Sequence, residues 1–499
     1  MIRQASRIFA ALIFALPCAR AFATLPPPAR HVLLISVDGL HAVDLARYVA
    51  DHPRSALGHL QAAGVSYTDA RTPAPADSFP GLLALLTGGT PAVTGVYYDV
   101  TWDRRFAPPT GPCIARGARV AWNESIDRAG GGSIDPGKLP RDPARGCAPV
   151  RPWQYLRVNT VFDVVRQAGG GTAWADKHPA YDIIQGPHGD GVEDLYTPEI
   201  GANGEDLASA AGRGITGSIV RTEAYDAHKM EAVLHEIAGL RHDGRTPAPV
   251  PAVFGLNIQE VNVAQKVAGY LSADGAPSAP LENALHHVDA LLHEARAALA
   301  AHGLAASTLI ILTAKHGNGP IDPSRVRHIP AIALREAIER AAPGELAQLT
   351  ADQGALVWLH RASAAARIAH SLDAERAPLG IQRVLWGARL ALRFPAPAGD
   401  SRAPDLIVIP EDGVIYAKPG AVKRAEHGGF LADDRHVALL LSGPMLAAPG
   451  RRLHAPVMTT QVAPTILRAL GLDPARLDAV REQGTPVLRG LVWHETQSE

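Results

Sequence analysis

Apolar runs that suit buried strands alternate with helical segments along most of this chain, and this alternation constrains the fold most. The run HVLLISVDGL at 31–40 is continuously apolar and ends in Asp-Gly, which is typical of a strand buried on both faces of a parallel sheet. Three further runs of this kind are PAVFGLNIQEV, STLIILTAKHG and HVALLLSGP. Helical spacing follows the first run at 44–64 and precedes the third at 281–303. The pattern predicts an α/β fold with a mostly parallel central sheet.

The segment at about 100–150 breaks the alternation. It is rich in Gly, Pro, Arg and Asp, shows little periodicity, and contains Cys113 and Cys147. We predict a long insertion closed by a disulfide, although two unpaired thiols are the alternative. A disulfide closing a loop of this length stabilises a fold by about 3–4 kcal/mol in the chain-entropy model.

The N-terminus resembles an export signal. Arg3 and Arg7 precede the apolar stretch IFAALIFALP, and Ala21-Phe22-Ala23 fits a small-x-small cleavage site. The stretch is too short to anchor the chain in a bilayer, and Pro17 disfavours a lipoprotein signal at Cys18. We therefore expect a signal peptide at 1–23, a linker at 24–30, and a periplasmic or secreted protein without a membrane span.

Length and charge narrow the remaining classes. A chain of 499 residues that is 47% hydrophobic can bury a large core, so we expect one domain at 31–475 and a C-terminal tail at 476–499. The net charge of -1, with 21 His counted as neutral, gives no basic footprint for a nucleic acid polymer or an anionic membrane. The sequence does not indicate an oligomeric state.

Polar residues stand at the ends of the predicted strands. Asp38 ends the first strand, Lys315 and His316 follow TLIILT, and His427 precedes HVALLL. Ligands bind at the carboxyl ends of strands in open α/β sheets, and a carboxylate with two imidazoles suits a divalent cation such as zinc. Each residue alone also fits a simple turn or a structural histidine.

Ser78 lies in ADSFPGLLALLTGGTP, directly before a predicted helix. A helix N-terminus offers free N–H groups and the positive end of the helix dipole, and a hydroxyl beside a cation there can attack phosphorus. The alternative is that Ser78 merely caps the helix.

Five segments, taken in this order, resemble the type I phosphodiesterase/nucleotide pyrophosphatase family of the alkaline phosphatase superfamily. They are ISVDGLHAVDL, TPAPADSFPGLLALLTGGTPAVTGV, LTAKHGNGPID, EHGGFLADDRHVALLLSGP and TTQVAPTILRALGL, and they span about residues 30–475. The resemblance implies an alkaline-phosphatase-like three-layer sandwich with loop insertions. It also implies two zinc ions that flank a Ser or Thr nucleophile. In that family the first ion takes an Asp from the first strand, the nucleophile and an Asp-His pair, and the second takes an Asp and a His spaced four apart and a His from the HG loop.

The family pattern transfers to some residues of this chain. Asp38 matches the first-strand ligand, Ser78 the nucleophile, His316 the histidine of an Asp-His pair, and His427 the ligand from the HG loop. Asp99 stands where the family usually has an Asn that holds the phosphoryl oxygens, and an ionised Asp there would repel a phosphate.

The chain departs from the family at three ligands. Lys315 replaces the Asp of the Asp-His pair, and FGLNIQEVNVAQKVAGY lacks the family's Asp and His spaced four apart. An ammonium in place of a carboxylate disfavours a neighbouring dication. We therefore predict one divalent ion, zinc by its ligand types, rather than two, with Lys315 as a catalytic charge. Its ligands would be Asp38, Ser78, His316 and His427. The alternative is that Lys315 neutralises Asp38 in a dead site.

A further polar cluster lies at 175–200. Lys177 and His178 are predicted to bind substrate, and His188, Asp190 and Asp194 to lie over the same strand ends, unless the segment is only a solvated loop. Together these features predict an exported metal-dependent hydrolase of small phosphodiester or pyrophosphate substrates, acting through a covalent Ser78 intermediate. The alternatives are an inactive relative that serves as a binding module and an envelope phosphoryl transferase.

Overall fold

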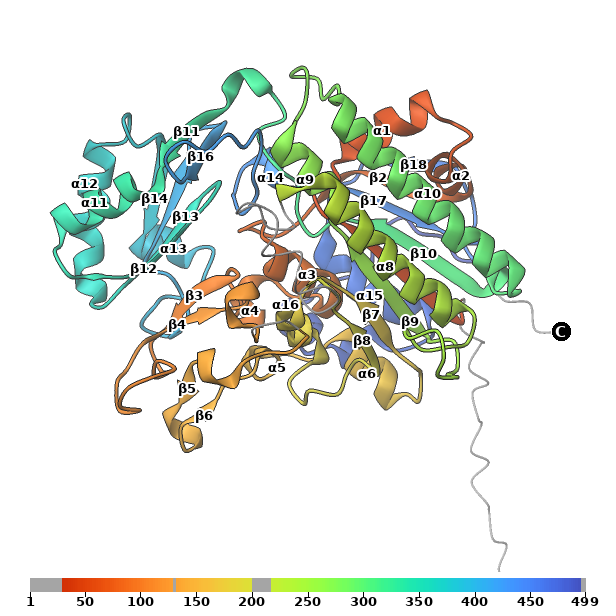
Figure 1. Ribbon diagram of the computed structural model, residues 1–499, viewed down its shortest axis with the longest axis horizontal. Coiled ribbons are helices and arrows are strands. Elements are labelled where there is room, and N and C mark those ends of the chain that lie inside the picture. Colours follow the sequence, from red (N-terminus) through yellow and green to blue (C-terminus); the bar gives the residue numbers. More distant parts are fainter. Residues whose placement is uncertain (1–28, 129–131, 200–216, 495–499) are drawn as a thin grey trace, which may run out of the picture.

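The computed structural model describes residues 29–128, 132–199 and 217–494. The predicted signal peptide at 1–23 and most of the predicted linker lie outside the described residues. A nine-stranded sheet forms the centre of the molecule (Figure 1). Its order is β18 (Arg451–Leu453), β2 (Gly64–Arg71), β17 (His436–Ser442), β10 (Thr308–Thr313), β1 (His31–Val37), β9 (Val253–Ile258), β7 (Ala173–Ala175) and β8 (Asp194–Tyr196), while β19 (Val457–Met458) also pairs with β2.

The sheet is mostly parallel, as predicted. β1 lies between β10 and β9 and is parallel to both, with Leu34 opposite Ile311 on one side and Gly255 on the other. β17 runs antiparallel to its two neighbours, β10 and β2. The alternative that the segment starting at 175 is only a solvated loop was wrong, because Asp194–Tyr196 extends the sheet edge as β8.

Two layers of helices cover the sheet, which confirms the three-layer sandwich. Alternate residues of β1 point to opposite faces, so Leu33 and Ile35 join one apolar core and Val32 and Leu34 the other. The first core includes helices α1 (Ala42–Asp51), α2 (Ala56–Ala63), α8 (Ile219–Ile237), α9 (Glu260–Val267) and α10 (Ala279–Ala301). The second includes α3 (Ser78–Thr87), α6 (Val161–Gln167) and α15 (Val462–Ala469).

A second sheet lies beside the central one (Figure 1). Its order is β12 (Leu346–Ala351), β13 (Ala355–Leu359), β15 (Leu406–Pro410) and β14 (Ile381–Trp386), and its core includes helices α11 (Ala331–Ala341) and α12 (Ala365–Ala374). β11 (Arg327–Pro330) pairs with β16 (Val414–Ala417) next to it. The turn between β12 and β13 carries Asp352, which reaches the candidate site.

The insertion at 100–150 contains two small hairpins. β3 (Val100–Asp103) pairs with β4 (Ala118–Ala121), and β5 (Arg141–Asp142) pairs with β6 (Ala148–Pro149). The predicted disulfide is present, with the sulfur atoms of Cys113 and Cys147 2.06 Å apart. Residues just after β4 turn toward the central sheet and form one wall of a cavity.

The C-terminal part adds two helices to the molecule. Thr459 and Thr460 form a short 3-10 turn, and α15 begins after Gln461 without a side-chain cap. Further on, α16 (Asp478–Gln483) packs against α3 and α4 (Pro91–Thr94). Within the described ranges, no helix combines the length and apolar character needed to cross a bilayer.

Candidate active site

A cavity of about 200 Å³ opens at the carboxyl-terminal edge of the central sheet. The predicted residues Ser78, Lys177, His178, His427 and Asp99 all line it. Asp38, Lys315 and His316 lie directly beneath, fully buried and within 4 Å of the lining residues. The structure therefore brings the predicted nucleophile, the predicted metal ligands, Lys315 and the predicted substrate-binding residues to one place. The further lining residues are Asp77, Phe79, Tyr98, Trp122, Asn123, Glu124, Tyr181, Gln259, Asn262, Lys266, Asp352, Lys423 and Glu426.

Ser78 is the first residue of α3 and faces the cavity. It does not cap the helix, because Asp77 is the N-cap and its carboxylate accepts a hydrogen bond from the Phe79 N–H at 3.3 Å. The helix can approach the strand ends closely because residue 81 is glycine, where a Cβ would lie 2.1 Å from the Lys315 carbonyl oxygen. The Ser78 hydroxyl is thus free of a local structural task and lies next to the charged groups under the cavity.

Asp38 follows β1 and shares its carboxylate between two ammonium groups. Lys177 Nζ lies 2.7 Å from Oδ2 and Lys315 Nζ lies 3.5 Å from Oδ1, while the Asn257 amide donates to Oδ2 at 3.2 Å. Burial acts to raise the pKa of Asp38, but the two lysines outweigh it and hold the pKa far below its ordinary value. Asp38 is therefore a permanent anion that holds two cations in place.

The two lysines differ in their environments. Lys177 Nζ also lies 3.3 Å from Ser78 Oγ, and Asp38 holds the pKa of Lys177 well above its ordinary value despite burial. Lys315 is more distant from Asp38 and 3.8 Å from Asp176, so burial dominates and lowers its pKa to about 8. The Lys315 ammonium donates to Tyr181 Oη at 3.3 Å and lies 4.7 Å from the ring centroid. Lys177 is thus the fully charged group next to Ser78.

His316 is oriented toward Ser78. Its Nδ1 lies 3.0 Å from the Gly317 carbonyl oxygen, which can only accept, so Nδ1 carries the proton. Its Nε2 is then an acceptor, and it lies 3.3 Å from Ser78 Oγ and 3.9 Å from the Asp38 carboxylate. Burial, with a further contribution from His427, lowers the pKa of His316 well below its ordinary value. A neutral imidazole therefore faces the serine hydroxyl.

His427 stacks on His316, with their ring centroids 3.9 Å apart. It belongs to a second group of charged side chains. Its Nδ1 lies 3.1 Å from Glu426, and Glu426 binds Lys266 Nζ at 2.6 Å and also pairs with Lys423. Burial and the nearby Lys266 lower the pKa of His427 to about 4. A neutral histidine and an ammonium therefore stand side by side at this end of the cavity.

The outer wall of the cavity is acidic. Burial, then the neighbouring Asp77, raises the pKa of Asp99 to about 8, and burial likewise raises that of Asp77 to about 7. Tyr98 donates to Asp352 at 2.9 Å, and burial raises the Asp352 pKa to about 7. A protonated carboxyl donates a hydrogen bond, so near neutral pH Asp99 need not repel a phosphate as an ionised carboxylate would.

Part of the second predicted cluster lies elsewhere. Lys177 and His178 follow the carboxyl end of β7 and reach the cavity, but His188 and Asp190 are exposed. Asp194 begins β8 and therefore stands at the opposite edge of the sheet, paired with His242. Sequence reasoning missed Asp176, although it follows a buried strand in the same way as Asp38 and carries the same signal.

The donor set does not fit the two zinc ions that the resemblance implies. Within the described part of the chain, one group of three His, Cys, Asp or Glu side chains has converging ligand atoms. It consists of His52 at the end of α1 and Glu282 and His286 on α10, away from the cavity. At the cavity, Asp38, Ser78 and His316 approach one another, but the Lys177 ammonium lies against two of these three groups. The predicted fourth ligand, His427, faces Glu426 and Asp77 instead.

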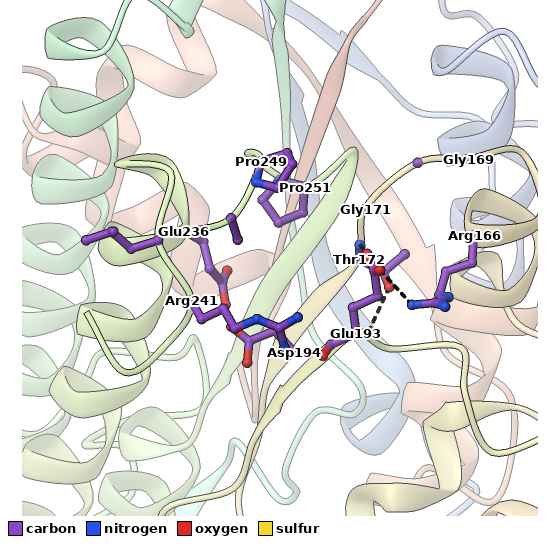
Figure 2. Close-up of a pocket in the computed structure, with 13 residues that line it drawn as sticks. Arg166, Gly169, Gly171, Thr172, Glu193, Asp194, Glu236, Arg241, Pro249 and Pro251 are labelled. Atoms are coloured by element: carbon purple, nitrogen blue, oxygen red, sulfur yellow. Dashed lines mark hydrogen bonds and ion pairs between the residues drawn. The ribbon is translucent and has the colours of Figure 1, made fainter. Parts of the chain in front are cut away.

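A second pocket, of about 310 Å³, lies at the opposite edge of the sheet, since Thr172 and Pro251 precede β7 and β9 (Figure 2). Figure 2 shows Arg166 reaching from α6 to Glu193, at 2.8 Å. Glu236 of α8 also lines this pocket, and neither of its carboxylate oxygens has a hydrogen-bond partner. The Thr172 hydroxyl in this pocket donates to the Gly191 carbonyl oxygen at 2.8 Å, and the lining holds no pair of ammonium groups around one carboxylate.

Comparison with known proteins supports the family resemblance. The sequence profile of the family described as type I phosphodiesterase/nucleotide pyrophosphatase matches residues 32–430. No curated protein matches the chain.

Solved structures share the fold at low sequence identity. Murine ectonucleotide pyrophosphatase/phosphodiesterase 5 superposes with a TM-score of 0.58 at 14% identity, covering 89% of this chain and 96% of that one. An inactive variant of the same murine protein has been solved in complex with AMP. The wild-type alkaline phosphatase PafA superposes with a TM-score of 0.61 at 12% identity, with the same coverage of 89% and 96%. Both likenesses show the fold.

Proposed function

Because the chain belongs to the type I phosphodiesterase/nucleotide pyrophosphatase family, and so is a hydrolase of the alkaline phosphatase superfamily, we propose that it cleaves phosphodiester or pyrophosphate bonds through Ser78. The observation that carries this proposal is the position of the Ser78 hydroxyl. It faces the cavity at the start of α3, 3.3 Å from an unprotonated imidazole nitrogen and 3.3 Å from an ammonium. A serine that only capped its helix would have no need of either neighbour.

The proposed reaction has two steps. In the first, Ser78 Oγ attacks phosphorus, its proton passes to His316 Nε2, and the bond from phosphorus to the leaving oxygen breaks. The proton on His316 leaves with that oxygen. In the second step, water attacks the phosphorus of the Ser78 phosphoryl ester, a water proton passes through His316 Nε2 to Oγ, and the bond from phosphorus to Oγ breaks, which releases the product. Lys177 lies where it would stabilise the negative charge that develops on the phosphoryl oxygens. Lys315 pairs with Asp38 beneath the cavity and adds a second positive charge that would stabilise the same oxygens.

We propose that Asp99, Lys177 and His178 bind the substrate in the cavity. Asp99 lies on the outer wall, and His178 stands edge-on to Tyr181 at 5.1 Å with an unpartnered Nδ1. A cavity of about 200 Å³ suits a small phosphoester rather than a polymer. The disulfide favours an oxidising compartment, so we propose export to the periplasm or the medium. We also propose that residues 31–475 act as one catalytic unit.

Members of this family are metal-dependent phosphoesterases, which favours a divalent ion. The prediction of one zinc ion stays a prediction, because the donors at the cavity form no complete site for it. No step above depends on an ion.

Turnover of bis-p-nitrophenyl phosphate by the mature protein tests the proposal. Ser78→Ala should lower kcat at least 10³-fold, roughly the loss seen when a nucleophile is removed, with an unchanged melting temperature. An aryl phosphonate should label Ser78 in the wild type. Absence of both turnover and labelling would favour the inactive binding module, and phosphoryl transfer to an added alcohol in preference to water would favour the transferase.

A further inference from the structure

Three lysine side chains stand where the resemblance places metal ions or their ligands. Lys177 Nζ lies between Asp38 and Ser78, at 2.7 Å and 3.3 Å, and these two groups are the ligands that the first ion would share. A cation that bridges a strand-end carboxylate and the nucleophile is thus already present as part of the chain. Lys315 occupies the position of the first ion's second carboxylate and points its ammonium at the same Asp38.

The second ion position shows the same exchange. Its expected ligands are an Asp and a His spaced four apart, together with His427. On α9, Asn262 and Lys266 have that spacing, and both line the cavity. Lys266 Nζ lies 2.6 Å from Glu426, the residue that contacts His427. A neutral amide therefore stands in place of a carboxylate and an ammonium in place of an imidazole.

Charge balance explains why these exchanges occur together. An ammonium in a buried site repels a dication, and it needs a carboxylate partner of its own. Asp38 provides that partner to Lys177 and Lys315, and Glu426 provides it to Lys266. Once the ammonium groups are paired in this way, the carboxylates that a metal ion would require are already neutralised.

We propose that ammonium groups replace both metal ions in this enzyme, with Lys177 at the first position and Lys266 at the second, and that it cleaves its substrate without a metal. This inference rests on the proposed function for its catalytic part, while its metal-binding part stands on the geometry alone. Lys177 is then the cation that stabilises the Ser78 oxygen during attack, and Lys266 is a cation at the His427 end of the cavity.

Zinc binding by the purified full chain tests the inference without substrate. His286→Ala serves as the background, because it dismantles the separate trio of His52, Glu282 and His286 that would also take up zinc. After dialysis against zinc and then buffer, this protein should retain less than about a tenth of an equivalent, and chelators should leave aryl phosphodiester turnover unchanged. One tightly held equivalent, lost together with turnover upon chelation, would overturn the inference.

Restoring the family's ligands provides the opposite test. In the same background, Lys177→Ala, Lys315→Asp, Asn262→Asp and Lys266→His together should raise zinc affinity at least 100-fold, as measured by titration calorimetry. If the melting temperature shows that this variant does not fold, Lys177→Ala with Lys315→Asp alone should still gain zinc at the first position. A folded variant with no gain would contradict the placement of the ammonium groups at ion positions.

Failure of this inference and failure of the proposed function have different signatures. If Ser78→Ala leaves turnover unchanged, the proposed function fails while the zinc measurements remain valid. If Ser78 is required but turnover needs zinc, the metal-free site fails and the nucleophile stands.

Discussion

Two buried carboxylates at opposite edges of the same sheet have pKa values shifted in opposite directions, because their neighbouring groups differ. Asp38, at the carboxyl-terminal edge, is surrounded by two ammonium groups and an amide. Glu236, in the pocket of Figure 2, is equally buried but has no hydrogen-bond partner, and burial raises its pKa well above the ordinary value. The pKa of Asp38 is shifted the opposite way. Burial alone therefore does not distinguish the candidate active site, whereas a carboxylate compensated by ammonium groups beside Ser78 does.

The largest expected effect comes from removing the compensated charge. Asp38→Asn leaves Lys177 without its carboxylate and Lys315 with only Asp176, and breaking a buried ion pair costs about 3–5 kcal/mol. Thermal unfolding should show a lower melting temperature, and aryl phosphodiester turnover should fall with it. If Asp38→Asn were as stable as the wild type, the contrast between the two edges would not hold.

The disulfide closes the insertion that forms one wall of the cavity at the carboxyl-terminal edge of the sheet. Replacing Cys113 and Cys147 together by serine releases a loop with a sequence separation of 34, and we expect a loss of about 3 kcal/mol in urea unfolding. Because Trp122 and Glu124 line the cavity from this insertion, KM should rise more than kcat falls. An unchanged unfolding midpoint would mean that the insertion is held by its packing alone.

The acidic wall should make turnover depend on pH. Asp99 has a pKa of about 8, so it ionises above that pH and then repels the phosphoryl group. Asp99→Asn removes this repulsion, and the ratio of variant to wild-type kcat/KM should rise about tenfold between pH 7 and pH 9.5, about 1.4 kcal/mol. Lys315, with a pKa of about 8, titrates in both proteins and cancels in the ratio. A flat ratio would mean that the Asp99 carboxyl does not face the substrate.

The smallest effect is expected at the opposite edge, and its sign is reversed. The pKa of Glu236 is raised in the folded state, so the wild type loses stability as pH rises above the unfolded value near 4.5. Glu236→Gln does not titrate and should be more stable than the wild type at pH 8, by about 1 kcal/mol, with the difference vanishing below pH 4.5. Turnover should not change. Destabilisation at pH 8 would show that the Glu236 carboxylate has a partner.

Local patterns predicted the fold and the strand ends that form the candidate site. Continuous apolar runs ending in Asp38 or in Lys315-His316 identified strand ends, because a strand buried on both faces must be apolar and its first polar residues must lie at the sheet edge. The same rule would have found Asp176. The second sheet at 346–410 was not predicted, because β13 and β15 pair although they lie far apart in the chain, and no local pattern specifies that pairing.

The sequence by itself determined which groups reach the sheet edge, since strand ends and the start of α3 are set by local periodicity and helix signals. It also revealed that three metal ligands of the family pattern were missing. The sequence placed Lys315 at one of these positions, but only the tertiary structure decided which charged groups meet around them. Lys177 and Ser78 are 99 positions apart, and Lys266 and Glu426 are 160 apart, yet each pair meets in the cavity. Such contacts depend on how loops from different strands fold over one edge, and no local pattern specifies that arrangement.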